Sequence, residues 1–209
     1  RLLFDSLKQE NHAVETVICA SAIGYYGFHD DPRALHEDDA PGTDYLADVV
    51  KQWEHEANAI ETLGIRLVKI RIGVVLSNNG GALPEIAKPV RYYAGAALGS
   101  GLQYLSWIHM DDLCAIFLKA VEDSALHGAY NAVAPNPVTN RELTQHIAAA
   151  LKKPLWLPPI PAFVLKALLG EMADLALRGS NVSAEKILNT GFTFSFTHAA
   201  PAVQDLLKK

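Results

Sequence analysis

The chain has 209 residues, half of them apolar and a fifth charged, so it can bury a substantial core and should be globular. Its formal net charge of -5 comes without basic runs or alternating basic and aromatic residues, which argues against a nucleic-acid-binding surface. No apolar stretch approaches the roughly 20 residues of a membrane helix, and the two cysteines stand far apart, so we expect no membrane partner and a reducing, cytoplasmic location.

The first predicted elements are a helix and a buried strand. Residues 1–7 place Leu3 and Leu7 on one helical stripe without a preceding cap or initiator methionine, so we expect the chain to begin inside a larger fold. Residues 14–20 (VETVICA) are apolar and β-branched, which predicts a strand. The glycine-bearing residues 21–27 (SAIGYYG) would form the loop at its carboxyl end, followed by an exposed loop over residues 30–42.

A long helix and a second strand come next. From Asp44 on, apolar positions that include Val50, Trp53 and Ala57 recur every three or four residues, and Gly64 ends this pattern. Residues 65–76 (IRLVKIRIGVVL) are almost continuously apolar and predict one strand. A strand, a helix and a strand in this order form a βαβ unit, which implies a parallel sheet.

The rest of the chain predicts helices with short extended pieces between them. We expect a helix over residues 82–93, interrupted near its two prolines, and a helix capped by Asp111 or Asp112 that runs to Val121. A strand over residues 128–132 and a helix opened by a capping box at Thr139 should follow. Four prolines in residues 154–161 separate residues 1–152 from a small, mostly helical appendage, residues 153–209, with an extended piece at residues 192–196.

Candidate chemistry lies at the carboxyl ends of the two strands, where ligands bind in open parallel sheets. Ser21 could hydrogen-bond a substrate hydroxyl or carbonyl, although a turn serine that binds its own backbone is an equal alternative. Tyr25 and Tyr26 could donate a proton or offer a stacking surface, but aromatic packing at the rim of the sheet explains them as well. The second end comprises residues 73–81.

Several segments, in this order, resemble extended short-chain dehydrogenases/reductases. The stretch CASAIGYYG (residues 19–27) is similar to the serine-bearing strand end of that family, and its doubled tyrosine resembles the epimerase-family proteins labelled nucleoside-diphosphate-sugar epimerases. Further similar segments cover essentially the whole chain: WE (residues 53–54), RIGVVL (71–76), GSGLQ (99–103), WIHMDD (107–112), YNAVAP (130–135), LGE (169–171) and GF (191–192).

The resemblance implies an α/β fold: part of a doubly wound, Rossmann-type parallel sheet with a small C-terminal helical region on the substrate side. Ser21 would correspond to the family's catalytic serine, with Tyr25 and Tyr26 beside it. The residues expected to contact NADP or NAD are Arg1, Ala20, Arg71, Gly73, Val74 and Val75. The HMDD stretch (residues 109–112) would be a structural turn and helix cap.

Three departures from the family pattern limit this expectation. The glycine-rich phosphate-binding loop is absent from these 209 residues, so this polypeptide should bind dinucleotide poorly. Leu46 and Val50 occupy the places of the usual catalytic tyrosine and lysine, while Tyr45 and Lys51 are each one residue away. Leu105 stands where relatives that bind nucleotide sugars carry an arginine, which would grip a diphosphate.

We therefore expect an NAD(P)-dependent epimerase or oxidoreductase that acts on a polar small molecule, with nucleotide sugars among the candidates. The alternative is a non-catalytic dinucleotide-binding sensor or interaction module that has lost the proton relay. The eight histidines are scattered, so no metal site is expected. A homodimer is an open alternative to the monomer.

Overall fold

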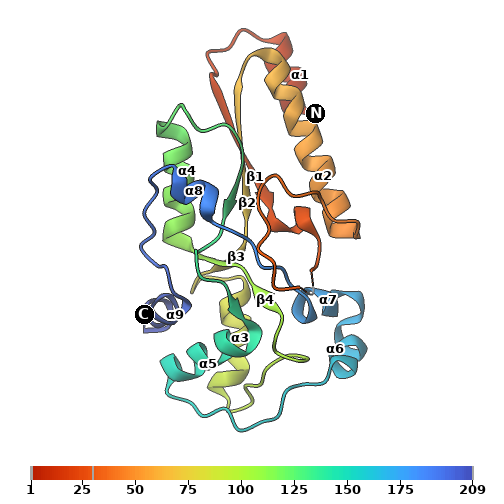
Figure 1. The fold of residues 1–209 in the computed structure, drawn as a ribbon, viewed down its shortest axis with the longest axis vertical. Coiled ribbons are helices and arrows are strands. Elements are labelled where there is room, and N and C mark those ends of the chain that lie inside the picture. Colours follow the sequence, from red (N-terminus) through yellow and green to blue (C-terminus); the bar gives the residue numbers. More distant parts are fainter. Residues whose placement is uncertain (1, 30, 209) are drawn as a thin grey trace.

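A computed structural model describes residues 2–29 and 31–208 (Figure 1). Within these residues the main sheet has three parallel strands in the order β1-β2-β6, namely β1 (Thr16–Ala22), β2 (Arg66–Ile72) and β6 (Gly128–Ala132). Ser21 lies opposite Arg71, and Arg71 lies opposite Asn131. The predicted parallel arrangement of the two candidate strands is confirmed.

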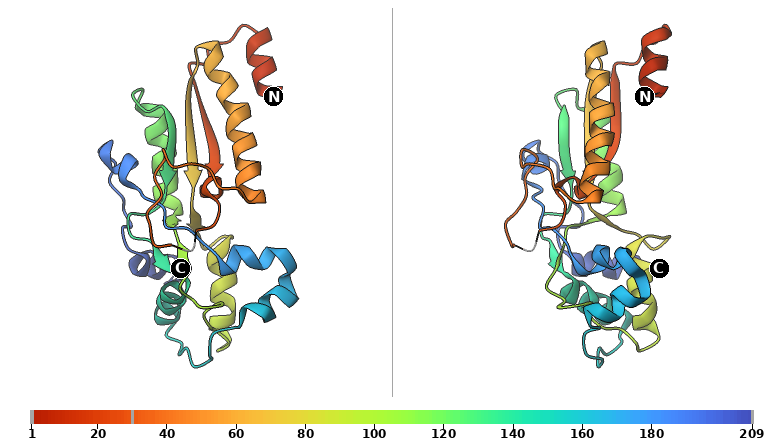
Figure 2. Two further views of the ribbon diagram at one scale, coloured as in Figure 1. Left: turned by 45° about the vertical axis from the view of Figure 1, so that its right-hand side comes forward. Right: turned by 90° about the vertical axis from the view of Figure 1, so that its right-hand side faces the viewer.

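Helices cover both faces of this sheet (Figure 2). Helices α1 (Leu2–Gln9) and α2 (Tyr45–Asn58) lie on one side, and α4 (Met110–Glu122) lies on the other. Because side chains alternate along a strand, β2 presents Val68 and Ile70 to the core that includes Ile116 of α4. Its other face carries Lys69 and Arg71 toward α2. The predicted α/β fold is confirmed.

A second apolar core lies beyond the carboxyl ends of these strands. Here β3 (Val74–Leu76) pairs in parallel with β5 (Trp107–His109), and β4 (Tyr104–Leu105) pairs antiparallel with β7 (Val138–Thr139). Helices α3 (Ala82–Arg91), α5 (Asn140–Leu151) and α9 (Ala199–Lys208) surround Trp107. The capping box that opens α5 is confirmed, with Thr139 and Glu142 bonded reciprocally.

Short helices complete the C-terminal part. Helices α6 (Ala162–Leu169) and α7 (Ala173–Leu177) project to one side of the second core, while α8 (Glu185–Asn189) packs on β6 (Figure 1). Three short 3-10 turns, η1 (Ile23–Tyr26), η2 (Ala59–Leu63) and η3 (Gly170–Met172), link longer elements. The positive φ of 76° at Gly64 ends η2, at the predicted place. None of the helices in the described residues is long and apolar enough to cross a membrane.

Two predicted elements have different bounds. The strand expected over residues 65–76 is broken at Gly73, where an added Cβ would collide with the Ser106 carbonyl oxygen and with Val133. Because glycine has no Cβ, the chain can pass through this crowded position. Before it, β2 pairs with β6, and after it, β3 pairs with β5. Helix α3 is continuous rather than interrupted. Pro84 lies in its first turn, where the missing N–H has no helical partner, whereas Pro89 lies inside the helix and removes one helical hydrogen bond without ending it.

Two local predictions were wrong, those on the cap of α4 and on the buried stripe of α2, and the piece predicted to be extended at residues 192–196 pairs with no strand. His109 caps α4 through Nδ1, which accepts from the Asp111 amide at 3.1 Å, so neither aspartate is the cap. Residues 192–196 form no strand: the buried Asp112 carboxylate accepts from the Ser195 and Phe196 amides at 2.7 and 3.0 Å. Trp53 is 58% exposed, since the buried stripe of α2 consists of four other residues: Ala47, Val50, Glu54 and Ala57.

Candidate functional site

A buried ion pair lies at the carboxyl ends of β1 and β2. Arg71 Nε donates to Glu54 Oε1 at 2.8 Å, and Arg71 Nη2 donates to Glu54 Oε2 at 2.9 Å. The two residues are only 3% and 5% exposed. Such a two-bond contact fixes both the distance and the orientation of the groups. Because Glu54 belongs to α2 and Arg71 to β2, the pair fixes the position of the helix on the sheet beside the predicted site.

Ser21 joins this pair from the neighbouring strand. Its Oγ donates to Glu54 Oε1 at 2.7 Å, and the residue is 6% exposed. Burial by itself raises the pKa of Glu54, but hydrogen bonds from Arg71 and Ser21 outweigh that effect and hold the pKa below its ordinary value. The carboxylate is therefore ionised at neutral pH, and the Ser21 proton is directed toward it.

Tyr26 extends the network across the sheet. Its hydroxyl donates to Asn131 Oδ1 at 2.7 Å and accepts from Arg71 Nη1 at 3.0 Å. The main-chain N–H of Asn131 donates to Glu37 Oε1 at 2.8 Å, which connects the loop after η1 to β6. Burial raises the pKa of Tyr26 to about 12, against the opposing effect of Arg71. Tyr26 therefore stays protonated at neutral pH, with its hydroxyl enclosed.

Tyr25 occupies a different position from its neighbour. Its ring stacks on the guanidinium of Arg71, whose central carbon lies 3.5 Å from the ring centroid, and contacts the Tyr26 ring edge-on. The side chain is only partly buried. Its hydroxyl makes no hydrogen bond to any residue in the described part of the chain. Of the two tyrosines, Tyr25 is the one available to a ligand.

Helix α2 brings apolar groups to the end of β1. A Cβ built on Gly24 would lie 3.7 Å from Val50 Cγ2 and 3.9 Å from Leu46 Cβ. These two positions are where the family resemblance places a tyrosine and a lysine. Tyr45 is 79% exposed, and Lys51 pairs with Asp48 at 2.6 Å. The one-residue offset therefore turns both polar side chains away from this site.

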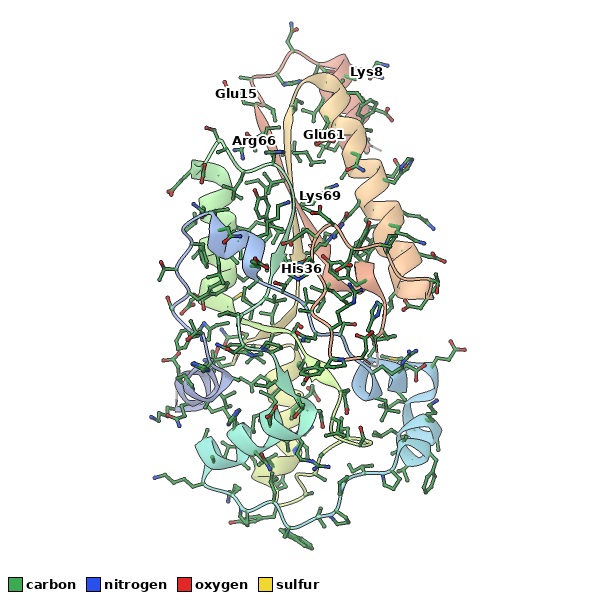
Figure 3. The ribbon with its side chains drawn as sticks, in the orientation of Figure 1. Lys8, Glu15, His36, Glu61, Arg66 and Lys69 are labelled. Carbon is green, nitrogen blue, oxygen red and sulfur yellow. The ribbon has the colours of Figure 1, made fainter. Side chains whose placement is uncertain are left out.

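The basic residues of β2 are held by the protein itself. Lys69 donates to Asn58 Oδ1 at 2.7 Å and lies 3.8 Å from Glu54 Oε2. Arg66 donates to main-chain carbonyls that include those of Ala120 and Leu126. Figure 3 shows Arg66 near the amino end of the strand and Lys69 closer to its middle.

The residues predicted to contact a cofactor fall into two groups. Ala20 is exposed on β1, which is an edge strand of the described sheet, whereas the guanidinium of Arg71 is committed to the buried network. Gly73, Val74 and Val75 continue from β2 into β3, and each is partly buried. Arg1 lies outside the described residues.

Sequence reasoning missed three members of the network: Glu37, Glu54 and Asn131. A signal existed for Glu54, because it lies four residues after Val50 and three before Ala57 on the buried stripe of a helix. A carboxylate on such a stripe needs a buried cation, and Arg71 in an apolar strand is the obvious partner. Glu37 gave no signal, since it lies in a loop without periodicity.

The described residues offer no evident metal-binding site. They contain no group of three or more His, Cys, Asp or Glu side chains that could hold a metal ion. Cys19 and Cys114 are both unpaired.

Comparison with known proteins decides the family. The chain is 35% identical to an epimerase family protein of Staphylococcus aureus, over 99% of this chain and 69% of that protein. The chain belongs to this epimerase family. An epimerase family homologue from Arabidopsis thaliana, described as chloroplastic, is 38% identical over 92% of this chain, which spans only 54% of that relative. Residues 160–206 also match a family described as a domain of unknown function, DUF1731.

A solved structure of a family member is similar over the whole chain. The human epimerase family protein SDR39U1, crystallised with NADPH, aligns with a TM-score of 0.90 and 30% identity, covering 100% of this chain and 70% of that one. The predicted membership of the extended short-chain dehydrogenase/reductase family is thereby confirmed.

Proposed function

We propose that this epimerase family protein is an NAD(P)-dependent oxidoreductase or epimerase. One observation carries the proposal: Ser21 and Arg71 lie side by side at the carboxyl ends of parallel strands, within a network that fixes the loop bearing Tyr25. Ligands of open parallel sheets bind at such ends. The NADPH in the human relative supports the same choice of cofactor.

The residues at this sheet end fit the nicotinamide part of a dinucleotide. Ala20 and Gly24 present small groups along the end of β1, so a flat ring can approach the main chain closely. Gly73 and Val74 would border the ring from the neighbouring strand. When bound, the cofactor supplies or accepts hydride, and the protein contributes position and electrostatics.

Tyr25 is our proposed proton donor. Its hydroxyl is not used by the described residues, and its ring is held in place by the stacked guanidinium of Arg71. Because Ser21 donates its own proton to Glu54, it would accept a hydrogen bond from the hydroxyl of the alcohol form of the substrate. Tyr26 would hold Arg71 in place, because its own hydroxyl is enclosed.

A comparison of three variants in the protein at its full natural length tests these roles. Tyr25→Phe should lower kcat at least about 100-fold, within the range of general acid catalysis, and Ser21→Ala should raise KM and lower kcat. Tyr26→Phe should mainly lower stability. Unchanged turnover in Tyr25→Phe would reject the proposed donor.

A non-catalytic dinucleotide sensor is the second candidate. The apolar Leu46 and Val50 beside Gly24 favour it, since they supply no proton relay from α2. The two functions differ in turnover: an enzyme exchanges hydride with some member of a carbonyl and sugar library, whereas a sensor binds the cofactor and exchanges with none. A cytosolic location and a homodimer stay predictions. A polar or nucleotide-sugar substrate is likewise a prediction.

A further inference from the structure

An apolar cavity of about 370 Å³ lies next to the proposed nicotinamide site. Val74, the residue after Gly73, forms one wall, and Leu105 of β4 forms another. The cavity is within the size range of small-molecule pockets, which is roughly 300–1,000 Å³. Leu175 also lines a second cavity, to which Leu46 contributes as well.

Backbone hydrogen bonds connect two of the segments that line the cavity. The Ile160 amide donates to the Ala97 carbonyl at 2.8 Å, and the Gly99 amide donates to the Ile160 carbonyl at 2.9 Å. These bonds fix residue 160, at the start of the segment that matches DUF1731, against the loop before β4. The cavity is therefore formed by elements that are already ordered. Ligand binding then costs less conformational entropy, because these elements need not become ordered on binding.

The lining carries no positive charge. Of its fourteen residues, only Glu85, Asn140 and Thr144 are polar, and none is Lys, Arg or His. A diphosphate needs cations or several N–H donors, and the Glu85 carboxylate would repel it. Leu105, at the place where nucleotide-sugar relatives carry an arginine, belongs to the apolar wall.

One polar donor remains inside the cavity. Asn140 is 3% exposed, and its Oδ1 accepts from the Leu98 amide at 2.8 Å, which fixes the orientation of the side-chain amide. Its Nδ2 has no partner among the described residues. The Thr144 hydroxyl donates to the Asn140 carbonyl at 2.8 Å and is not available. The cavity thus offers an apolar volume with one hydrogen-bond donor.

We propose that this cavity binds an uncharged, mainly apolar molecule with a single carbonyl group, a ketone or an aldehyde, and not a nucleotide diphosphate. The inference rests on the proposed function, because it names the substrate class of the same site. Hydride would add to the carbonyl carbon and a proton to its oxygen, giving an alcohol and the oxidised cofactor.

Binding can be measured without turnover. The neutral fluorophore N-phenyl-1-naphthylamine should bind the purified protein saturably, and 2-nonanone should displace it. UDP-glucose at about 1 mM, a concentration far above a micromolar Kd, should not. Displacement by UDP-glucose but not by 2-nonanone, or no saturable binding of the fluorophore, would overturn the proposal.

Matched variants locate the binding site. Leu105→Arg should weaken fluorophore binding at least about tenfold, because a longer, charged side chain would replace part of the apolar wall that the fluorophore contacts. Leu102→Arg makes the same change at a residue that is 63% exposed and outside this cavity, and should bind as the wild type does. Equal binding by both variants would contradict the assignment.

Two further measurements keep the outcomes distinct. If Leu105→Arg fails to fold, Ala94→Trp fills the cavity from an exposed rim position and should weaken binding to a similar extent. NADPH binding is titrated separately by calorimetry. Ketone displacement without NADPH binding would overturn the proposed function alone, whereas NADPH binding without ketone displacement would overturn this inference alone.

Discussion

Glu54 and Arg71 are the residues on which the site depends most directly. Glu54→Ala should lower the free energy of unfolding by about 3–5 kcal/mol, because the buried guanidinium would lose its partner. Urea unfolding measures the change. Glu61→Ala, at an exposed position on the following turn, is the control and should change stability by no more than about 0.5 kcal/mol. A loss in Glu54→Ala no larger than that of the control would contradict the network.

The same carboxylate makes stability depend on pH. The pKa of Glu54 is lower in the folded protein than its ordinary value of 4.5, so its stabilising effect is complete above that value and is lost as pH falls through the folded pKa. The stability difference between wild type and Glu54→Gln should therefore shrink as the pH falls below about 4.5. Denaturant titrations at several pH values test this, and a constant difference would speak against it.

Residue roles were only partly predictable from the sequence. Ser21, Tyr26 and Arg71 were singled out correctly as neighbours, because a βαβ unit brings the carboxyl ends of its strands together. The direction of each side chain was not predictable. Whether a hydroxyl faces a ligand or a buried carboxylate depends on α2, which approaches from another part of the chain.

At the scale of elements, Asp112 shows how one carboxylate can fix a segment that pairs with no strand. It is 1% exposed and accepts the two amides that hold residues 192–196 beside α4. Asp112→Ala should lower stability by about 1–3 kcal/mol through the unpaired amides. It should also remove hydrogen-exchange protection at Ser195 and Phe196.

Asp111→Ala is the matched control for this change. Its side chain is 73% exposed and makes no hydrogen bond to residues 195–196; its main-chain amide donates to His109 Nδ1, and its carboxylate lies 3.7 Å from that nitrogen. Protection of the Ser195 and Phe196 amides should be unaffected. Equal loss of protection in both variants would mean that Asp112 does not hold the tail.

Elements with strong local signals were predicted well. The strand at residues 128–132, the Thr139 capping box and the Gly64 stop all follow from short-range chemistry. The break at Gly73 was missed because it follows from the approach of Ser106 and Val133, which no local pattern reveals. Residues 192–196 are aromatic and have a high β propensity, but that propensity does not show whether a neighbouring strand is there to pair with them.

At the scale of the whole molecule, two cores meet at the carboxyl ends of β1 and β2. The upper core carries the charged network, and the lower one borders the apolar cavity that begins at Val74. Figure 1 shows how the chain passes from one to the other at β3. The proposed hydride transfer would take place at this junction, with the cofactor on the β1 side.

Calorimetric titration of the protein at its full natural length with NADPH tests this central claim most directly. We predict saturable binding with Kd on the order of micromolar, weakened at least about tenfold by Ala20→Trp, which places a bulky ring near the carboxyl end of β1. Ala125→Trp, an equal change at an exposed turn far along the chain, should bind as the wild type does. Absence of NADPH binding, or equal affinity in both variants, would contradict a cofactor site at this edge of the sheet.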